Sequence, residues 1–281
     1  MTGASDPRAV AINVAANTQL PGVRGPIGPD GRFEYVPIPE REPTDGPVPT
    51  YADLDLAVDL PPDLSDRRVH LDPEFAGVHG RTAYTYGDEH GVKAGPLSAL
   101  DPGDCLLFYA TLSFRAGFGG PASAEGPGAS AAERTKTSAA GEGTEPAADN
   151  PARAPFVLPD WGAYLLGEFR VAAAVTGEAF RDLPAAERER FASNAHLQRE
   201  TVDAKVLVRG DDRSRLYDRA VPLSATTGSE ANWLVTDLSS DSGKGPWWRR
   251  VLRFDPAATA ELRRVVDDPA RVVTDERFGA A

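Results

Sequence analysis

The chain has 281 residues, 41% of them apolar, and a formal net charge of −12 from 42 acidic and 30 basic side chains. A chain of this length builds one large domain or two small ones. An acidic surface repels phosphate backbones, which excludes tight charge-driven binding of duplex nucleic acid but not a pocket for one base or nucleotide. Only four residues are lysines. This composition predicts adaptation to a salty cell interior, although a GC-rich genome produces the same arginine bias.

Cys105 is the single cysteine, so the chain can form no internal disulfide. This favours a reducing compartment and predicts a cytoplasmic location. Its apolar neighbours predict a packing role rather than a nucleophilic one. We find neither a signal peptide nor a long apolar run, and therefore expect a soluble protein with no membrane partner.

The residue pattern of the N-terminal part predicts a short tail, a strand and a loop. We expect residues 1–8 to be a disordered tail, followed by a single α+β domain over residues 9–281. Residues 9–16 are nearly all apolar, which predicts a central strand. Residues 20–31 form a loop rich in Gly and Pro. Residues 32–40 alternate like a strand, and their prolines confine it to the edge of a sheet.

Two later segments predict the centre of the sheet. Residues 102–112 begin with Pro-Gly, which suits a type II turn, and continue as a buried apolar strand. Residues 161–171 alternate polar and apolar side chains and predict a half-buried strand. Residues 116–154 between them are dominated by Gly, Ala, Ser, Pro, Glu and Thr. This low-complexity insert predicts one long disordered surface loop inside the domain.

The C-terminal part predicts two helices and short strands. Residues 182–191 predict a helix with a proline in its first turn. Residues 204–208 and 215–223 predict two strands joined by a tight turn. A second helix should run from its N-cap, Asp255, through Arg264.

Asn13 and Arg24 are the first candidate ligand-binding residues. Asn13 lies near the end of the first predicted strand and Arg24 in the glycine-rich loop, and such loops often carry sites. The Arg24 guanidinium could hold a phosphate through two hydrogen bonds. The alternative is a surface turn with an exposed arginine.

His70, Asp72, Glu74 and Asp88 are the candidate catalytic residues. An imidazole titrates near neutral pH and suits acid–base catalysis, and Asp72 would share the strand face of His70. We predict no metal site, because no second His or Cys is evidently positioned beside His70. The alternative is that Asp72 and Asp88 only belong to turns.

Two further segments combine basic and other polar or aromatic side chains. His196 and Arg199 would share a face if the preceding helix continued, and could read a base edge or hold a phosphate. The alternative there is a polar helix end. Residues 247–254 contain two Trp and three Arg and alternate like a strand. Either they contact a base and phosphate, or one Trp packs in the core.

The order of these segments resembles the nucleotide modification associated domain family, third type. Its most specific matches are Tyr35–Glu40 (Tyr-Val-Pro-Ile-Pro-Glu), Asp72–Phe75 (Asp-Pro-Glu-Phe) and Thr85–Asp88 (Thr-Tyr-Gly-Asp). The likeness covers about residues 9–254, apart from the insert. It implies a role beside DNA- or nucleotide-modification systems and carries over no catalytic mechanism.

Residues 102–112 and 161–171 also resemble the start of the barrel in PUA-like domains of the ASCH and EVE kind. Those domains bind nucleotides, often modified ones, so this resemblance implies a pocket for a nucleobase. We therefore predict an α+β fold with a mixed sheet or a partly open PUA-like β-barrel and flanking helices.

We predict a nucleotide- or nucleobase-binding protein associated with DNA or nucleotide modification. Its partners would be a nucleotide or modified base and components of a DNA-modification system. The alternatives are an enzyme of nucleotide or base modification and an acidic adaptor for a protein partner; catalysis and any cofactor stay open. We expect one cleft to combine the four catalytic candidates with the ligand-binding candidates Asn13, Arg24, Tyr35, Glu40 and Tyr86; His196 and Arg199 are further ligand-binding candidates.

The acidic excess leads to a testable expectation about salt. Self-repulsion of the surface charges should lower the unfolding temperature as KCl is removed, and binding to duplex DNA should stay weak even at low salt. Thermal unfolding and a duplex titration across one KCl series check both. Micromolar duplex binding at moderate salt would contradict the expectation of a pocket for a single nucleotide.

Overall fold

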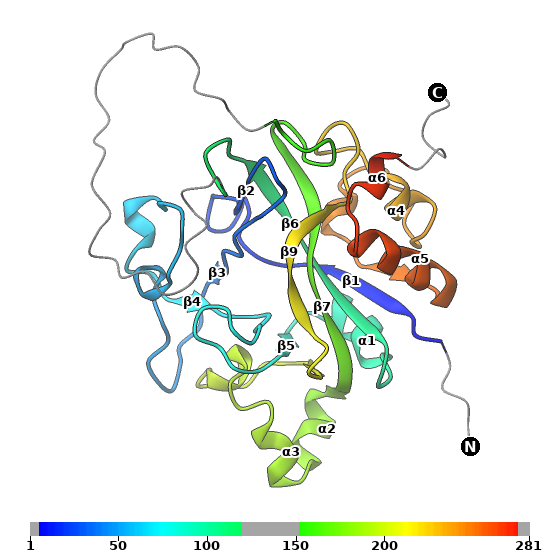
Figure 1. Ribbon diagram of the computed structural model, residues 1–281. Coiled ribbons are helices and arrows are strands. Elements are labelled where there is room, and N and C mark those ends of the chain that lie inside the picture. Colours follow the sequence, from blue (N-terminus) through cyan, green and yellow to red (C-terminus); the bar gives the residue numbers. More distant parts are fainter. Residues whose placement is uncertain (1–5, 120–151, 275–281) are drawn as a thin grey trace.

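The computed structural model describes residues 6–119 and 152–274 (Figure 1). The expectations for residues 1–5 of the tail and 120–151 of the insert lie outside the described residues. Both described ends of the insert lie against the loop at Gly28. The Phe118 carbonyl oxygen lies where a side chain on Gly28 would begin, and Ala154 N donates to the Pro29 carbonyl at 2.7 Å.

Two long antiparallel strands, β6 (Cys105–Phe114) and β7 (Trp161–Thr176), form the centre of the sheet, as predicted. Strand β1 (Ala9–Asn13) pairs with β6 in parallel, and β10 (Leu252–Phe254) pairs antiparallel with the other edge of β1. The first strand is therefore central, but it ends earlier than predicted. Ala15 adopts φ +68°, a left-handed conformation that ends an extended strand.

Strand β7 changes partners along its length. Its first half pairs with β9 (Arg215–Pro222) and its second half with β8 (Val206–Gly210). Strand β5 (Thr85–Asp88) follows at the outer edge of β8, and β2 (Pro26–Ile27) pairs with the end of β6. The result is a mixed eight-stranded sheet in the order β10-β1-β6-β7-β8-β5, with β2 and β9 beside the path.

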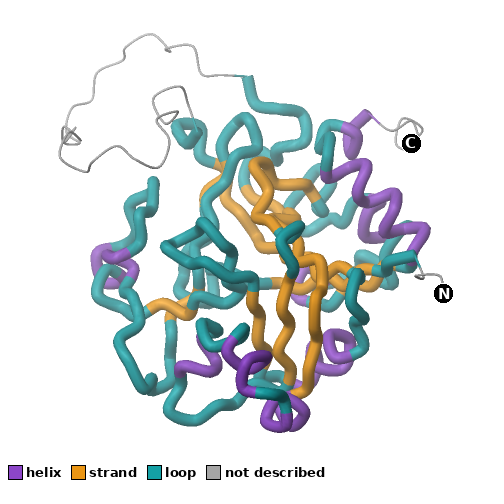
Figure 2. Tube along the Cα trace, turned by 60° about the horizontal axis from the view of Figure 1, so that its bottom comes forward, coloured by secondary structure: helices purple, strands orange, loops and turns teal. Residues whose placement is uncertain are grey.

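The predicted α+β class with a mixed sheet is confirmed. Among the described residues the sheet does not close into a barrel, so the PUA-like alternative is not supported. Figure 2 shows the strands crossing the middle of the molecule, with helices and loops around them.

The strand predicted over residues 32–40 is mostly wrong. Only β3 (Ile38–Pro39) is extended and paired, and its partner is β4 (Val69–His70) in a separate two-stranded sheet. Pro37 and Pro39 have no N–H to donate, which keeps this segment from joining a longer ladder. The following region contains two 3₁₀ turns, at Tyr51–Asp53 and Pro62–Leu64.

The helix predicted over residues 182–191 is split into α2 (Gly177–Asp182) and α3 (Ala185–Glu189). Pro184 stands between them with extended backbone, because the residue before a proline and the proline itself resist continuing a helix. Helix α5 (Pro256–Val266) is confirmed, with the predicted cap: Asp255 Oδ1 accepts from Ala258 N at 2.8 Å.

Three further α-helices are short. They are α1 (Gly91–Ser98), α4 (Trp233–Thr236) and α6 (Arg271–Thr274). Helices α4, α5 and α6 lie together on one side of the sheet, whereas α2 and α3 lie at the far end of β7 (Figure 1). None of the described helices combines the length and apolar character needed to cross a membrane.

Alternate side chains of β6 pack into two hydrophobic cores, one on each face of the sheet. Phe108 packs on the side of β5, and Cys105 and Tyr109 pack on the side of α5. Burial raises the pKa of Cys105 to about 11, which fits its predicted packing role. Trp247 is fully buried in the second core, so one Trp of the basic aromatic segment does pack inside.

The strand predicted over residues 247–254 begins only at β10. Trp247–Arg249 forms a 3₁₀ turn instead, which directs Trp247 into the core and leaves Trp248 partly exposed. The Trp247 indole N–H donates to the Ser229 carbonyl at 2.9 Å, so its polar atom is satisfied inside the protein.

The carboxyl group of Glu34 leads to a prediction about pH. Burial raises the pKa of Glu34 to about 7, against hydrogen bonds that include the one from Ala57 N at 2.7 Å. The folded protein holds this proton more tightly than the unfolded chain, so the free energy of unfolding falls as pH rises from about 4.5 to 7. Glu34→Gln should remove that fall and add about 1–3 kcal/mol at pH 8, after allowance for solvent screening.

Urea unfolding at pH 4.5 and pH 8 measures this effect. Glu200→Gln is the control, because it removes the same charge from an exposed position. Equal gains from both substitutions at pH 8 would mean that net charge, and not burial of Glu34, is responsible.

Candidate functional site

A cavity of about 200 Å³ lies where the end of β1, strand β5 and helix α1 meet the 3₁₀ turn Ala195–Gln198. Seven of the eleven side chains singled out from the sequence line it, and they come from four separate parts of the chain. These seven are Asn13, His70, Asp72, Tyr86, Asp88, His196 and Arg199.

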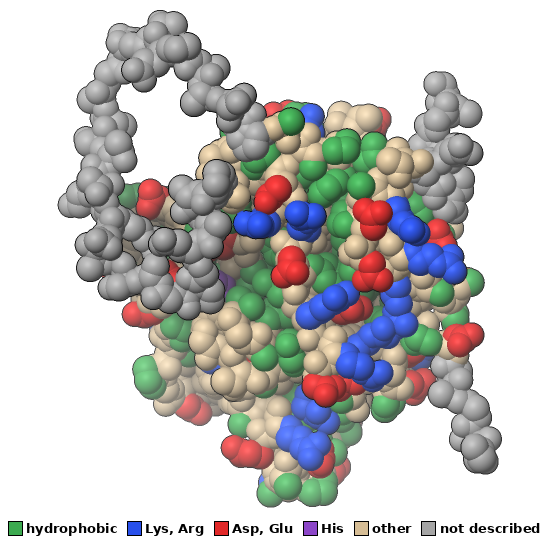
Figure 3. All heavy atoms as spheres, viewed as in Figure 1, with side chains coloured by type: hydrophobic (Ala, Val, Ile, Leu, Met, Phe, Trp, Pro, Cys, Tyr) green, Lys and Arg blue, Asp and Glu red, His purple; other side chains and the backbone are tan. Residues whose placement is uncertain are grey.

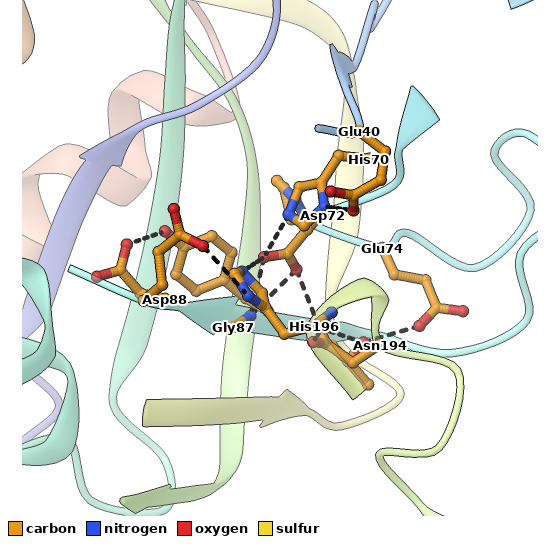
Figure 4. Close-up of polar contacts among 12 residues, drawn as sticks. Glu40, His70, Asp72, Glu74, Gly87, Asp88, Asn194 and His196 are labelled. Carbon is orange, nitrogen blue, oxygen red and sulfur yellow. Dashed lines mark hydrogen bonds and ion pairs between the residues drawn. The ribbon is translucent and has the colours of Figure 1, made fainter. Parts of the chain in front are cut away.

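The Asp72 carboxylate is the centre of this cluster (Figure 4). Its two oxygens accept from the backbone N–H of Gly87 at 3.1 and 3.0 Å, and Oδ1 also accepts from Asn194 Nδ2 at 3.0 Å. The Nε2 atoms of His196 and His70 lie 3.4 and 3.8 Å from Oδ2. Asp72 therefore joins β5, the segment after β4 and the 3₁₀ turn.

Local structure aims His196 at this carboxylate. Asn194 caps the 3₁₀ turn, because its side-chain oxygen accepts from His196 N at 3.1 Å. The two imidazole rings meet edge to face, with centroids 4.8 Å apart. Gly87 leaves room for this arrangement, since a Cβ there would lie 2.6 Å from His196 Cδ2.

Each imidazole also bonds a second carboxylate through its other nitrogen. His70 Nδ1 lies 2.6 Å from Glu40 Oε2, and His196 Nδ1 lies 2.7 Å from Asp203 Oδ1. Arg199 connects these two carboxylates, donating to Glu40 from Nη2 at 3.0 Å and to Asp203 from Nη1 at 2.5 Å. The result is one continuous network of charged groups with little exposure.

The pKa values reflect this network. Burial lowers the pKa of His196, but its hydrogen bonds to Asp72 and Asp203 and the charge of Asp72 outweigh burial and raise it to about 9. Burial raises the pKa of Glu40, yet the hydrogen bond and charge of His70, with help from Arg199, bring it well below its ordinary value. His196 is therefore charged and Glu40 ionised near neutral pH.

A second polar group stands at the wall of the cavity. The Tyr86 hydroxyl donates to Asp88 Oδ1 at 3.1 Å, and Lys93 Nζ donates to the Tyr86 oxygen at 3.2 Å and to the Asn13 carbonyl at 3.3 Å. Burial, with the nearby charges of Asp88 and Asp72, raises the pKa of Tyr86 well above its ordinary value. Tyr86 thus stays protonated as a donor.

Four sequence candidates lie outside the lining of this cavity, and three of them, Glu74, Tyr35 and Glu40, have partners within the protein. Glu74 is buried, and it accepts from Arg81 Nε at 3.0 Å and from the hydroxyls of Thr85 and Ser193 at 2.8 and 2.7 Å. Tyr35 is buried with its hydroxyl donating to the Pro73 carbonyl. Glu40 bonds the Nδ1 atom of His70, on the side of the ring that faces away from Asp72. These contacts give Glu74 and Tyr35 structural partners rather than access to a ligand.

Arg24 lies in a smaller cavity of about 80 Å³ next to the first. Asn13 and Asn17 line both cavities, so they form a shared wall. Arg24 and Arg249 line the smaller one, and no carboxylate of the described part of the chain does. The Arg24 guanidinium lies over the Trp161 ring, 4.3 Å from its centroid, and its Nε has no hydrogen-bond partner among the described residues.

Sequence reasoning missed several residues of this region. Lys93 carries no motif, and Asp203 meets His196 only because the chain turns back after the 3₁₀ segment. Gly87 stood inside the Thr-Tyr-Gly-Asp match, but nothing in the sequence showed that a histidine from elsewhere would press against it. These residues became recognisable only through their contacts.

Two sets of side chains present atoms close enough to hold a metal ion. One is His70, Asp72 and His196, and the other is Glu89, His196 and Asp203; within each set the ligand atoms lie within 4.8 Å of one another. The expectation of no metal site rested on the lack of a second histidine near His70. His196 supplies that histidine from a distant part of the chain.

Comparison with known proteins gives one match. The family model described as nucleotide modification associated domain 3 matches residues 8–268. No curated protein and no solved structure matches the chain.

The tight fit around Gly87 gives a prediction for this site. In Gly87→Ala the new methyl group would also lie 2.9 Å from Asn194 Oδ1, so His196 and Asn194 must move and the free energy of unfolding should fall by about 1–3 kcal/mol. Chemical denaturation measures the loss, and the imidazole NMR signals of His196 report the displacement.

Gly95→Ala is the matched control. Gly95 is exposed in α1 with no atom near the added methyl group, so the same change should be neutral or stabilise by up to about 1 kcal/mol. Equal stability of the two variants would show that the site does not depend on close packing at Gly87.

Proposed function

The chain belongs to the nucleotide modification associated domain 3 family, and from this premise we propose that it binds a single nucleotide or nucleobase as part of a DNA- or nucleotide-modification system. The observation that carries the proposal is a pair of adjacent cavities with different linings: acidic, basic and imidazole groups in the larger one, and arginines in the smaller one. Asn13 and Asn17 form the wall that both share.

The smaller cavity suits the phosphate. Arg24 and Arg249 supply two guanidinium groups, and the described lining contains no carboxylate to neutralise them. A guanidinium binds phosphate oxygens through paired hydrogen bonds. Trp248 adds an aromatic surface beside these charges, against which a sugar or base can pack.

The larger cavity suits the base. Asp88 accepts hydrogen bonds, Lys93 donates them, and the asparagine side chains of the shared wall do both. Its carboxylates disfavour a phosphate and favour the amino groups on a base edge. A volume of about 200 Å³ is below the roughly 300–1,000 Å³ of clefts for drug-sized ligands, so one base fits the space better than a longer segment.

The surface supports a pocket over an extended nucleic-acid groove. On the face shown in Figure 3, Lys and Arg side chains run down the right half of the molecule, and acidic side chains lie along them. With a net charge of −12, affinity must come from the few groups inside the cavities and not from the overall field.

An enzyme that modifies the bound nucleotide is the second candidate function. It is favoured by the buried His70–Asp72–His196 cluster at the floor of the larger cavity. Burying these charged groups costs more free energy than filling the same space with apolar side chains. Titratable groups with shifted pKa values in a cavity are typical of reaction sites. Within this hypothesis His196 is a proton donor and Asp72 orients both imidazoles.

The adaptor hypothesis has less support. Among the described residues, the exposed large hydrophobic side chains are Val92, Val202 and Val273, which come from different elements. They are separate residues in the sequence and not a stripe of one element, whereas a docking surface usually presents a contiguous apolar patch.

Calorimetric titration with deoxynucleoside monophosphates and the matching nucleosides tests the proposal. The monophosphates should bind more tightly, because only they reach both cavities. Arg24→Gln and Arg249→Gln should each weaken the monophosphates about 10-fold or more and leave the nucleosides unchanged, since a hydrogen bond to a charged group contributes about 1.5–3 kcal/mol.

Arg253→Gln is the matched control, because it removes an exposed arginine on β10 that lines neither cavity. If all three arginine variants lose affinity equally, the effect is one of overall charge. If monophosphates and nucleosides bind equally, the assignment of the smaller cavity to phosphate is wrong.

A further inference from the structure

We propose that His70, Asp72 and His196 form a binding site for one divalent first-row transition-metal ion at the floor of the larger cavity. The proposal rests on the side-chain geometry alone and does not require that the ligand be a nucleotide. It replaces our sequence-based expectation that the chain holds no metal.

The spacing of the three ligand atoms fits such an ion. Asp72 Oδ2 lies 3.4 Å from His196 Nε2 and 3.8 Å from His70 Nε2, and all three lie within 4.8 Å of one another. An ion held at about 2.0–2.2 Å from nitrogen and oxygen ligands separates those ligands by about 3–4 Å. Small rotations of the side chains, with release of the proton that His196 Nε2 holds in the metal-free protein, would complete the coordination.

The outer contacts are those that a metal-binding histidine needs. A ligating imidazole usually donates its other N–H to a carboxylate, which fixes the tautomer and the orientation of the ring. Both histidines have this partner: Glu40 Oε2 for His70 Nδ1 at 2.6 Å, and Asp203 Oδ1 for His196 Nδ1 at 2.7 Å. Both therefore present Nε2 toward Asp72.

The second possible set, Glu89 with His196 and Asp203, fits a cation less well. Arg199 Nη1 already contacts both of these carboxylates, at 2.5 Å each, so a guanidinium charge occupies their side of the cluster. Among residues 6–119 and 152–274, no Arg or Lys makes such a contact with Asp72, whose remaining bonds come from neutral groups, the Gly87 N–H and the Asn194 amide.

The donor set indicates the class of ion. Imidazole nitrogen suits Zn²⁺, Fe²⁺, Co²⁺, Ni²⁺ and Cu²⁺, whereas Mg²⁺ and Ca²⁺ prefer oxygen-only sites. Three protein ligands leave coordination positions free for water or a substrate atom. Because the cluster lines the larger cavity, those positions would face the space that Tyr86 and Asp88 also line.

Titration of the chelator-treated full chain with Zn²⁺ and Co²⁺ tests the proposal, with calorimetry for stoichiometry and X-ray absorption to count imidazole ligands. We expect one tight site with two imidazoles, and much weaker binding of Mg²⁺. His196→Gln and Asp72→Asn should weaken Zn²⁺ by more than about 100-fold. Asp203→Asn, which acts on a positioning residue, should weaken it by about 10–100-fold.

His90→Gln is the matched control, because His90 is exposed and belongs to neither set. Its Zn²⁺ affinity should equal that of the unchanged protein. Circular dichroism excludes unfolded variants, and the absorption measurement on the unchanged protein needs no variant at all. Three results would overturn the proposal. The titration could show no single tight site, the absorption measurement could find fewer than two imidazole ligands, or folded His196→Gln could bind Zn²⁺ as tightly as His90→Gln. Since no nucleotide is present, the result is independent of the nucleotide titration.

Discussion

The candidate site depends on the hydrogen bonds and the ion pair that the buried carboxylate of Asp72 makes. A charge in this position is tolerated only where hydrogen bonds and opposite charges surround it. Gly87 N, the Asn194 amide and the imidazole of His196 supply them from two other parts of the chain. Removing one partner of such a buried pair costs about 3–5 kcal/mol, because the other charge stays behind uncompensated. The same contact that fixes the floor of the larger cavity therefore also fastens β5 to the 3₁₀ turn.

Arg199 extends this constraint to the outer contacts. It holds Glu40 and Asp203, and these hold the far sides of the two imidazoles. The histidines thus have little freedom to turn, which is the kind of support that positions a reacting or coordinating atom. The smaller cavity is built differently, from the ends of two strands, the loop after β1 and the 3₁₀ turn at Trp247–Arg249. A bonded cluster of carboxylates and imidazoles on one side of the shared wall and two arginines on the other would suit the proposed ligand, which has two unlike ends.

Much of the fold could be predicted from local pattern. The periodicity of β6 and β7 identified the central pair, and the Asp255 cap marked the start of α5, because those signals lie within a few residues of one another. The site was harder. His70 and Asp72 were recognisable as a local pair, but their meeting with His196 depends on how β5 and the 3₁₀ turn pack, which no spacing in the sequence reveals. Glu74 looked equivalent to Asp72 in sequence, and only its partners Arg81, Thr85 and Ser193 show that it serves structure.

The position of the insert has a consequence for how fast the protein folds. The connection from β6 to β7 runs from residue 115 to residue 160, so the central strand pair can form only when the unfolded chain closes that whole loop. Closure entropy rises slowly with loop length, so added residues there cost little in equilibrium stability. The rate, however, is sensitive to contacts distant in sequence, and β1 and β10 must also join across most of the chain. A sheet with this strand order therefore tolerates changes in the length of the β6–β7 connection, but it nucleates slowly. Slow nucleation lengthens the time for which its apolar strands stay exposed during synthesis.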